Sequence, residues 1–233
     1  MSSKRYEKAK AMVDREKYYS IDEAIKLLKS FPPPKFDETA ELHFKLGVDP
    51  RKADQNIRNS VILPHGTGKK VKVLVFAEGE QAEQAKEAGA DYVGMEDLIE
   101  KIKGGWFDFD VAIAVPRAMK EVGKIGRLLG PRGKMPNPKV GTVTNDVKKA
   151  VTDSKAGKVA YRVDKSSNVH MPIGKVSFED KKIKENLLTA LNAILKDRPA
   201  SVKGVYLKSL TLSSTMNPGI KLDVASATLE AKK

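Results

Sequence analysis

The central part of the chain alternates short apolar runs with amphipathic stretches. Val71–Ala77 and Phe109–Val115 are apolar and rich in β-branched residues, which is typical of buried strands. Helix-favouring residues follow each run, so the pattern predicts βαβ units and a parallel sheet. The expected helices are Glu80–Ala88, Met95–Ile102, Ala118–Leu129 and Asp146–Ser154, and a further strand is expected at Asp91–Val93.

The two ends of the chain are richer in strands. A helix over Ser20–Leu28 begins with a capping box, because Glu23 follows Ser20 by three positions. A long amphipathic helix is expected where Ile183, Leu187, Leu188, Leu191, Ile194 and Leu195 share one face. The expected strands are Thr39–Val48, Val61–Pro64, a hairpin of Val159–Val163 with Asn168–Val176, and the final pair Gly204–Leu212 and Ile220–Val224.

This arrangement predicts an α/β protein of two domains. Residues 1–67 and 159–233 would form one discontinuous α+β domain, and residues 68–158 would be an inserted α/β domain. Three consecutive small domains are the alternative, but neither end alone has enough strands to cover its apolar faces. The expected hinge comprises the two segments that connect the domains. Gly66, Thr67 and Gly68 lead into the inserted domain, and Gly157 and Lys158 lead back to the first domain.

Composition narrows the class of protein. Among 233 residues there is no Cys, which excludes disulfides, thiolate zinc sites and a cysteine nucleophile. The longest run without a charged residue is Ser209–Ile220, too short and too polar to cross a membrane. The N-terminal residues carry both signs of charge and do not resemble a secretory signal, so a cytoplasmic protein is expected. When free, the protein is expected to be a monomer.

Charge points to a polyanionic partner. Lys and Arg number 43 against 30 Asp and Glu, a net charge of +13, which favours nucleic acid over the alternative of charge kept only for solubility. Residues 68–158 have a net charge of +4 and the ends +9. Within the insert, seven basic residues and the single acid Glu121 form what we term the second basic surface: Arg117, Lys120, Lys124, Arg127, Arg132, Lys134 and Lys139.

Motifs for enzymatic chemistry are incomplete. The stretch His65–Lys69 lacks the first glycine and the final Ser/Thr of a phosphate-binding loop. The three histidines, His43, His65 and His170, lie in separate segments without the spacing of metal ligands. Carboxylate pairs such as Asp37 and Glu38 are merely adjacent. The sequence therefore predicts no enzyme, no cofactor and no metal site.

Two loops have compositions that suit a partner surface. Leu128–Pro138 combines glycines, prolines and basic residues after an expected helix, which fits either a presented surface or a structural turn. Ser213–Gly219 joins the last two strands and offers hydroxyls, an amide and a thioether without any charge. Such a patch can bind ribose hydroxyls and recognise the shape of an RNA backbone. The alternative is that this segment is a plain hairpin loop.

Seven ordered motifs resemble a known family. They are Lys35–Thr39, Leu46–Arg51, Leu63–Lys69, Leu129–Gly133, Met135–Lys139, Gly141–Thr144 and Ser214–Met216. In this order and spacing they are similar to the bacterial large-subunit ribosomal protein L-one family, the family of the mobile lateral stalk. The resemblance extends from about residue 4 to residue 224.

The resemblance implies a fold and a set of partners. The family has a first domain built from both termini and a Rossmann-like, three-layer inserted domain. Its members bind 23S rRNA in the large ribosomal subunit, contact deacylated tRNA at the exit site, and repress translation of their own operon mRNA without catalysis. Two rivals remain: an α/β enzyme acting on nucleotides, and a translational regulator that never enters ribosomes.

Carried over by position, the resemblance also implies a set of RNA-binding residues, which we term the contact strip. Lysines would neutralise phosphates, hydroxyls would bind ribose, and Phe36 and Met216 would pack on sugars or bases. At Asn59, Ser167 and Asn217 the family usually has Gly, which serves either a left-handed turn or a close RNA approach. The contact strip is Lys35, Phe36, Thr39, Asp164, Lys165, His170, Ser209, Thr215, Met216, Asn217 and Pro218.

Overall fold

The computed structural model describes residues 3–232, and its chain divides into two compact units. Unit 1 comprises Met1–Gly68 and Val159–Lys233, and unit 2 comprises Lys69–Lys158. The predicted domain boundaries differ from this division by one residue, at Gly68. Residues 1–2 and 233, which the predicted discontinuous domain includes, lie outside the described residues. That each unit is a domain in its own right stays a prediction.

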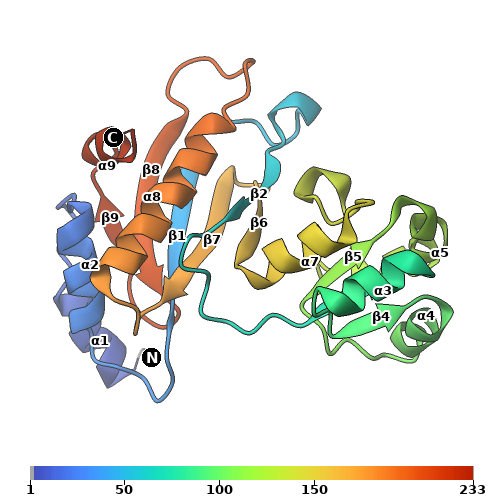
Figure 1. Cartoon of the computed structure of the whole chain (residues 1–233). Helices are drawn as coiled ribbons and strands as arrows, with labels where there is room; N and C mark the ends of the chain where they lie inside the picture. Colours follow the sequence, from blue (N-terminus) through green and yellow to red (C-terminus); the bar gives the residue numbers. More distant parts are fainter. Residues whose placement is uncertain (1–2, 233) are drawn as a thin grey trace. The chain divides into compact units, whose positions relative to one another are not determined.

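Unit 1 is built on an antiparallel sheet with the strand order β7-β1-β8-β9 (Figure 1). Strand β1 (Thr39–Leu46) lies between β7 (Asn168–Lys175) and β8 (Leu207–Ser214), and β9 (Ile220–Leu222) forms the edge beyond β8. The N-terminal and C-terminal parts of the chain therefore share one sheet.

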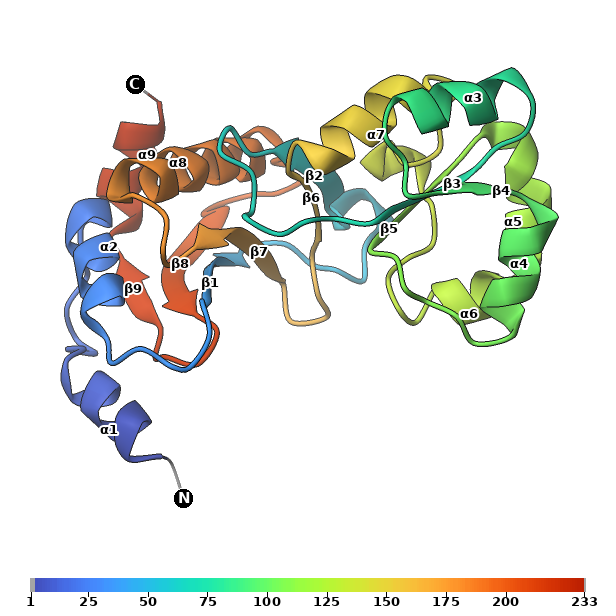
Figure 2. The same cartoon turned by 60° about the horizontal axis from the view of Figure 1, so that its bottom comes forward.

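One side of this sheet is buried under helices. Buried and partly exposed residues alternate strictly along β1, with Leu42 and Phe44 on the buried side. Against this side pack α2 (Ile21–Ser30), α8 (Asp180–Lys196) and α9 (Val224–Ala231). Figure 2 shows α8 and α9 along the same side of the strands. Helix α2 has the expected capping box at Ser20 and Glu23.

The predicted hairpin at residues 159–176 is wrong. Strand β6 (Lys158–Arg162) pairs with β2 (Arg58–Ile62) in a separate two-stranded sheet, whereas β7 pairs with β1. A tight turn does join β6 to β7, but Val163 N donates to Ile57 O at 2.9 Å and keeps β6 beside β2. Turn signals are local, whereas the choice of partner strand depends on residues a hundred positions away.

Unit 2 contains the expected parallel sheet, in the order β4-β3-β5. Its strands are β3 (Val73–Phe76), β4 (Tyr92–Gly94) and β5 (Val111–Ala114). Strand β3 is buried throughout, because helices cover both faces of the sheet. The helices are α3 (Glu80–Glu87), α4 (Glu96–Lys103), α5 (Met119–Lys124), α6 (Gly126–Leu129) and α7 (Val147–Lys155). The α/β class is confirmed.

Several element boundaries differ from the expected ones. The helix predicted over Ala118–Leu129 is broken at Ile125, where φ is −99° and ψ is 10°. Gly123 and Gly126 flank the break, and glycine weakens a helix interior. Strand β2 begins at Arg58, three residues before the expected strand. Helices α1 (Lys4–Ala11) and α9 were not predicted. Short 3-10 turns lie at Ala53–Gln55, Pro116–Ala118 and Pro138–Val140.

A buried asparagine in α8 ties the end of the first segment of unit 1 to the sheet. Asn186 is fully buried, and its amide donates to Ile173 O at 2.7 Å and to Gly66 O at 2.9 Å. Its carbonyl oxygen accepts from His65 N at 3.1 Å. The hydrophobic periodicity of the sequence did not predict that Asn186 is buried, because a polar residue interrupts the apolar face of the helix. Part of the predicted hinge, Gly66, is thereby anchored to unit 1.

We expect Asn186→Leu to destabilise the protein by about 2–4 kcal/mol, because the change leaves three backbone groups without their partner in a buried site. Urea unfolding measures this loss. Asn192→Leu on the same helix is the matched control, since the Asn192 side chain makes one hydrogen bond, to Ala231 O, in a partly buried position. Equal losses for the two variants would contradict the proposed role of Asn186.

Candidate nucleic-acid interface

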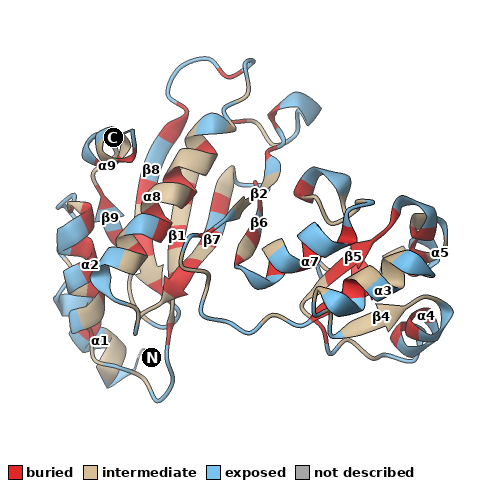
Figure 3. Ribbon diagram, viewed as in Figure 1, coloured by how far each residue is buried: buried red, intermediate tan, exposed pale blue. Residues whose placement is uncertain are grey.

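The side of the unit 1 sheet opposite its helices is polar. We term it the open face; on β1 it presents Thr39, Glu41, His43 and Lys45. Figure 3 shows buried residues alternating with partly exposed ones along these strands. Because neighbouring strands keep the same alternation, residues paired with these positions point to the same side.

Cross-strand pairing places two contact-strip residues on the open face. His43 lies opposite His170 of β7 and Thr211 of β8. One row further along, Lys45 lies opposite Asn168 and Ser209. His170 and Ser209, separated by 39 positions in the sequence, thus flank the central strand on adjacent rows. Both are exposed.

The two histidines on this face are in direct contact. The Nδ1 atoms of His43 and His170 are 2.8 Å apart, and the rings meet edge to face with centroids 5.0 Å apart. His43 Nε2 lies 2.7 Å from Ser213 Oγ. Burial lowers the pKa of His43 below its usual value of 6.5, and the neighbouring His170 lowers it further, although Glu41 opposes the shift. A hydrogen bond between the two Nδ1 atoms requires that one of them accept, and the accepting ring must be neutral.

The turn between β6 and β7 carries Asp164 and Lys165. Asp164 Oδ1 accepts hydrogen bonds from Ser166 N and Asn168 N, both at 2.8 Å. These backbone donors, that of Asn168 first, lower the pKa of Asp164. Asp164 Oδ2 is 3.5 Å from His170 Nε2, so the turn is joined to the open face. Lys165 is exposed at its tip.

Residues before β1 and after β8 meet at one end of the sheet. Thr39 N donates to Thr215 Oγ1 at 3.1 Å, and Thr215 N donates to Thr39 O at 3.2 Å. Met216 is 53% exposed beside this contact. The structure therefore brings together Thr39 and the 215–218 loop, which the sequence separates by about 175 positions.

A buried carboxylate holds that loop. Glu38 is 4% exposed, and its Oε2 accepts from Ser214 Oγ and from Asn217 Nδ2, both at 2.6 Å. Glu38 Oε1 is buried and has no hydrogen-bond partner among the described residues. From the other side, Arg5 donates to Asn217 Oδ1 and to Met216 O, both at 2.7 Å. We term these contacts of Glu38, Asn217 and Arg5 the loop clamp.

Sequence reasoning missed two members of the loop clamp. Glu38 was considered only as half of an adjacent carboxylate pair, and Arg5 was one of many charges in the N-terminal stretch. A glutamate between the exposed Phe36 and the first residues of a strand gives a weak signal of burial. Arg5 gives none, because its partners in the loop clamp lie more than 200 positions away.

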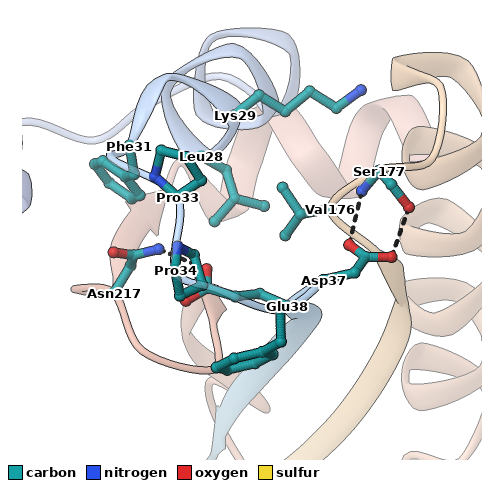
Figure 4. Close-up of a pocket in the computed structure, with 11 residues that line it drawn as sticks. Leu28, Lys29, Phe31, Pro33, Pro34, Asp37, Glu38, Val176, Ser177 and Asn217 are labelled. Carbon is teal, nitrogen blue, oxygen red and sulfur yellow. Dashed lines mark hydrogen bonds between the residues drawn. The ribbon is translucent and has the colours of Figure 1, made fainter.

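The segment before β1 presents Lys35 and Phe36 to solvent. Asp37 fastens it to the end of β7: Ser177 N donates to Asp37 Oδ1 at 3.3 Å and Ser177 Oγ to Asp37 Oδ2 at 2.7 Å (Figure 4). Phe36, which is 53% exposed, lies at a cavity of about 360 Å³. The other residues lining it are Leu28, Lys29, Phe31, Pro33, Pro34, Asp37, Glu38, Val176, Ser177 and Asn217.

The three departures from glycine have different structural consequences. Ser167 adopts a left-handed conformation with φ of 63°, a conformation that glycine adopts at lower cost. Among the described residues it is the one non-glycine position with positive φ, so Asn59 and Asn217 do not serve left-handed turns. Asn59 instead donates to Asp197 Oδ1 at 2.9 Å, and Asn217 belongs to the loop clamp.

Six residues of the second basic surface are exposed, and the seventh is not. Lys134 is half-buried and donates to Phe107 O at 3.0 Å and to Phe109 O, so its ammonium group serves the packing of unit 2. Arg132 stacks on the Phe107 ring with its guanidinium carbon 3.5 Å from the centroid. Lys124 pairs with Glu121 at 2.5 Å. The exposed residues are Arg117, Lys120, Lys124, Arg127, Arg132 and Lys139.

The predicted hinge residues lie at the boundary between the units. Gly66, Gly68 and Gly157 all have positive φ, of 61°, 72° and 105°. A side chain at Gly68 would come within 2.8–2.9 Å of Lys175 and Phe178. Thr67 lies between the two glycines, and Lys158 begins β6. Hinge motion itself stays a prediction.

The described residues contain neither a cluster of metal-ligating side chains nor a helix suited to crossing a membrane. Within residues 3–232, no three His, Asp or Glu side chains gather as a metal site would require. None of the helices in this part of the chain has the length and hydrophobicity that crossing a bilayer requires.

Comparison with known families gives one match that covers most of the chain. Residues 28–218 match the family model described as the ribosomal protein L1p/L10e family. This range includes every residue of the contact strip and the whole of unit 2.

We expect Asn217→Ala to lower the free energy of unfolding by about 1.5–3 kcal/mol, because a buried carboxylate loses one of its two donors. Asn217→Asp should cost more at neutral pH, since it places a second carboxylate against Glu38. Chemical denaturation of both variants tests the loop clamp, and wild-type stability in Asn217→Ala would refute it.

Stability should fall as the pH drops below about 6.5, in part through His43. Its pKa is lowered in the folded protein, so the unfolded chain binds the proton more tightly and acid favours unfolding. His43→Gln should therefore lose less stability than the wild type between pH 7.5 and 5.5. Urea unfolding at both values measures the difference, and equal losses in the two proteins would show that His43 does not contribute.

Proposed function

Because the chain belongs to the ribosomal protein L1p/L10e family, it is a structural RNA-binding protein of the large ribosomal subunit, and we propose that its contact strip binds 23S rRNA to form the lateral stalk. The observation that carries this proposal is the gathering of the strip. Residues 35–39, 164–170 and 209–218 come from both ends of the chain and lie on the open face or at its ends. Separate roles for these segments would not require a common surface.

The side chains of the contact strip suit the binding of RNA better than the binding of polyanions in general. Lys35 and Lys165 are exposed cations for phosphates. Thr215 and Ser209 offer hydroxyls for the ribose 2′-OH, which distinguishes RNA from DNA. Phe36 and Met216, both 53% exposed, provide apolar surface for sugars or bases.

The loop clamp supports the proposal by limiting the freedom of the 215–218 loop. A loop held by Glu38 and Arg5 loses little further conformational entropy when RNA binds. The Asn217 side chain is turned toward Glu38 and Arg5, so it leaves the approach to Thr215 and Met216 clear. The asparagine therefore takes the place of the family's glycine without blocking the RNA.

Two further activities complete the proposal. The protein would contact exit-site tRNA, for which the six exposed residues of the second basic surface are candidates, and would assist its release. It would also repress its own operon mRNA by binding a segment that mimics the rRNA site, through the same contact strip. Both activities rest on membership of the family, and neither requires catalysis.

Thr215→Ala tests the contact strip. We expect it to weaken binding to an rRNA fragment containing the stalk helices by about 1–3 kcal/mol, because a desolvated ribose hydroxyl loses its partner. Thr215→Ser is the matched control, since it keeps the hydroxyl and the acceptor for Thr39 N. Equal affinities for the alanine variant and the wild type would remove Thr215 from the RNA site.

A further inference from the structure

A cavity on unit 1 gathers three cations outside the open face. Its volume is about 350 Å³, and Arg58, Arg162 and Lys165 line it together with Asn56, Val163 and Asp164. All three basic side chains are exposed. Lys165 belongs to the contact strip, whereas Arg58 and Arg162 were not among the predicted RNA-binding residues. We term this cavity the arginine pocket.

Strand pairing explains why the two arginines share one cavity. Arg58 is the first residue of β2 and Arg162 the last residue of β6. They are the immediate neighbours of Ile57 and Val163, which the hydrogen bond from Val163 N to Ile57 O joins. The pairing that contradicted the predicted β6–β7 hairpin is therefore what brings the arginines together.

The positive charge of the pocket is only partly compensated, because three cations share the cavity with one carboxylate, Asp164. Within residues 3–232, the side chains of Arg58, Arg162 and Lys165 form no ion pair or hydrogen bond. The carboxylate in the pocket, Asp164, already accepts from two backbone amides and from Asn168 Nδ2. Three like charges in one cavity repel each other, and an anion bound among them would relieve the repulsion.

An adjoining cavity that Arg58 also lines contains two more carboxylates, both engaged. Asp197 accepts from Asn59 Nδ2 at 2.9 Å and from Tyr161 Oη at 2.6 Å. A hydrogen bond from Ser201 lowers the pKa of Asp54. Neither carboxylate forms an ion pair with Arg58 among the described residues, so the guanidinium of Arg58 remains available to an external acceptor.

We propose that the arginine pocket binds a phosphate group of the RNA backbone, on the strand that leaves the open face across the 164–168 turn. This inference rests on the proposed function and extends the RNA site beyond the contact strip. The turn connects the two surfaces, because Asp164 lies in the pocket and contacts His170 of the open face. Guanidinium groups match the paired oxygens of a phosphodiester, and a contact to phosphate carries no sequence information.

The test is the salt dependence of RNA binding by the full chain. The double variant Arg58→Gln/Arg162→Gln is compared with the wild type on an rRNA fragment containing the stalk helices and on an unrelated structured RNA of equal length. Loss of one phosphate contact should lower the slope of log affinity against log salt by about 0.7–0.9. Affinity for both RNAs should fall by a similar factor, on the order of tenfold, because the contact does not depend on sequence.

The control removes the same charge elsewhere on unit 1. Lys26→Gln/Lys181→Gln changes exposed residues of α2 and α8, on the helix-covered side of the sheet, and should leave the slope within about 0.3 of the wild type. Circular dichroism establishes that both double variants are folded, and Lys165→Gln, in a turn, provides a milder second variant. Equal slopes for the pocket and control variants would overturn the inference.

The outcomes separate the pocket from the proposed function. If the wild type prefers the stalk RNA and the pocket variant keeps the wild-type slope, only the inference about the pocket fails. If the wild type binds both RNAs equally well, the proposed function fails. The slopes of the two variants then still decide whether the pocket binds phosphate.

Discussion

The structure of unit 1 depends on the position of β1 between two strands from the far end of the chain. A strand with alternating apolar and polar residues buries one side against helices and leaves the other side polar. Because β7 and β8 keep the alternation of β1, the polar side extends across three strands. Any change of register by one residue would turn His43 and Lys45 into the core. The open face is thus a direct consequence of packing.

Buried polar residues hold the loop segments next to the sheet in place, which strand pairing alone does not do. Asn186 anchors the chain where it leaves unit 1, and Glu38 anchors the loop after β8. Both side chains satisfy groups from distant segments, so each acts as a cross-link between parts of the discontinuous unit. Such residues are costly to remove, because their partners remain buried without a hydrogen bond.

Local signals predicted the local features well. The capping box at Ser20, the buried strand at Val73–Phe76 and the face of α8 all follow from residues within a few positions of one another. Features set by distant pairing were missed. The sequence near Val163 indicated a turn but not that β6 joins β2, and nothing near His43 indicated His170. The contact strip itself was identified by resemblance to a family, since the chemistry of isolated Thr and Met residues is not specific.

The central claim is that RNA lies on the open face of unit 1 and at its ends. Cross-linking the full chain to a 4-thiouridine-labelled stalk rRNA fragment, followed by mass spectrometry of the attached peptides, tests it most directly. We expect cross-links within residues 35–45, 164–170 and 209–218 and none on the outer surfaces of α2 and α8. Cross-links confined to those helices or to residues 69–158 would contradict the account.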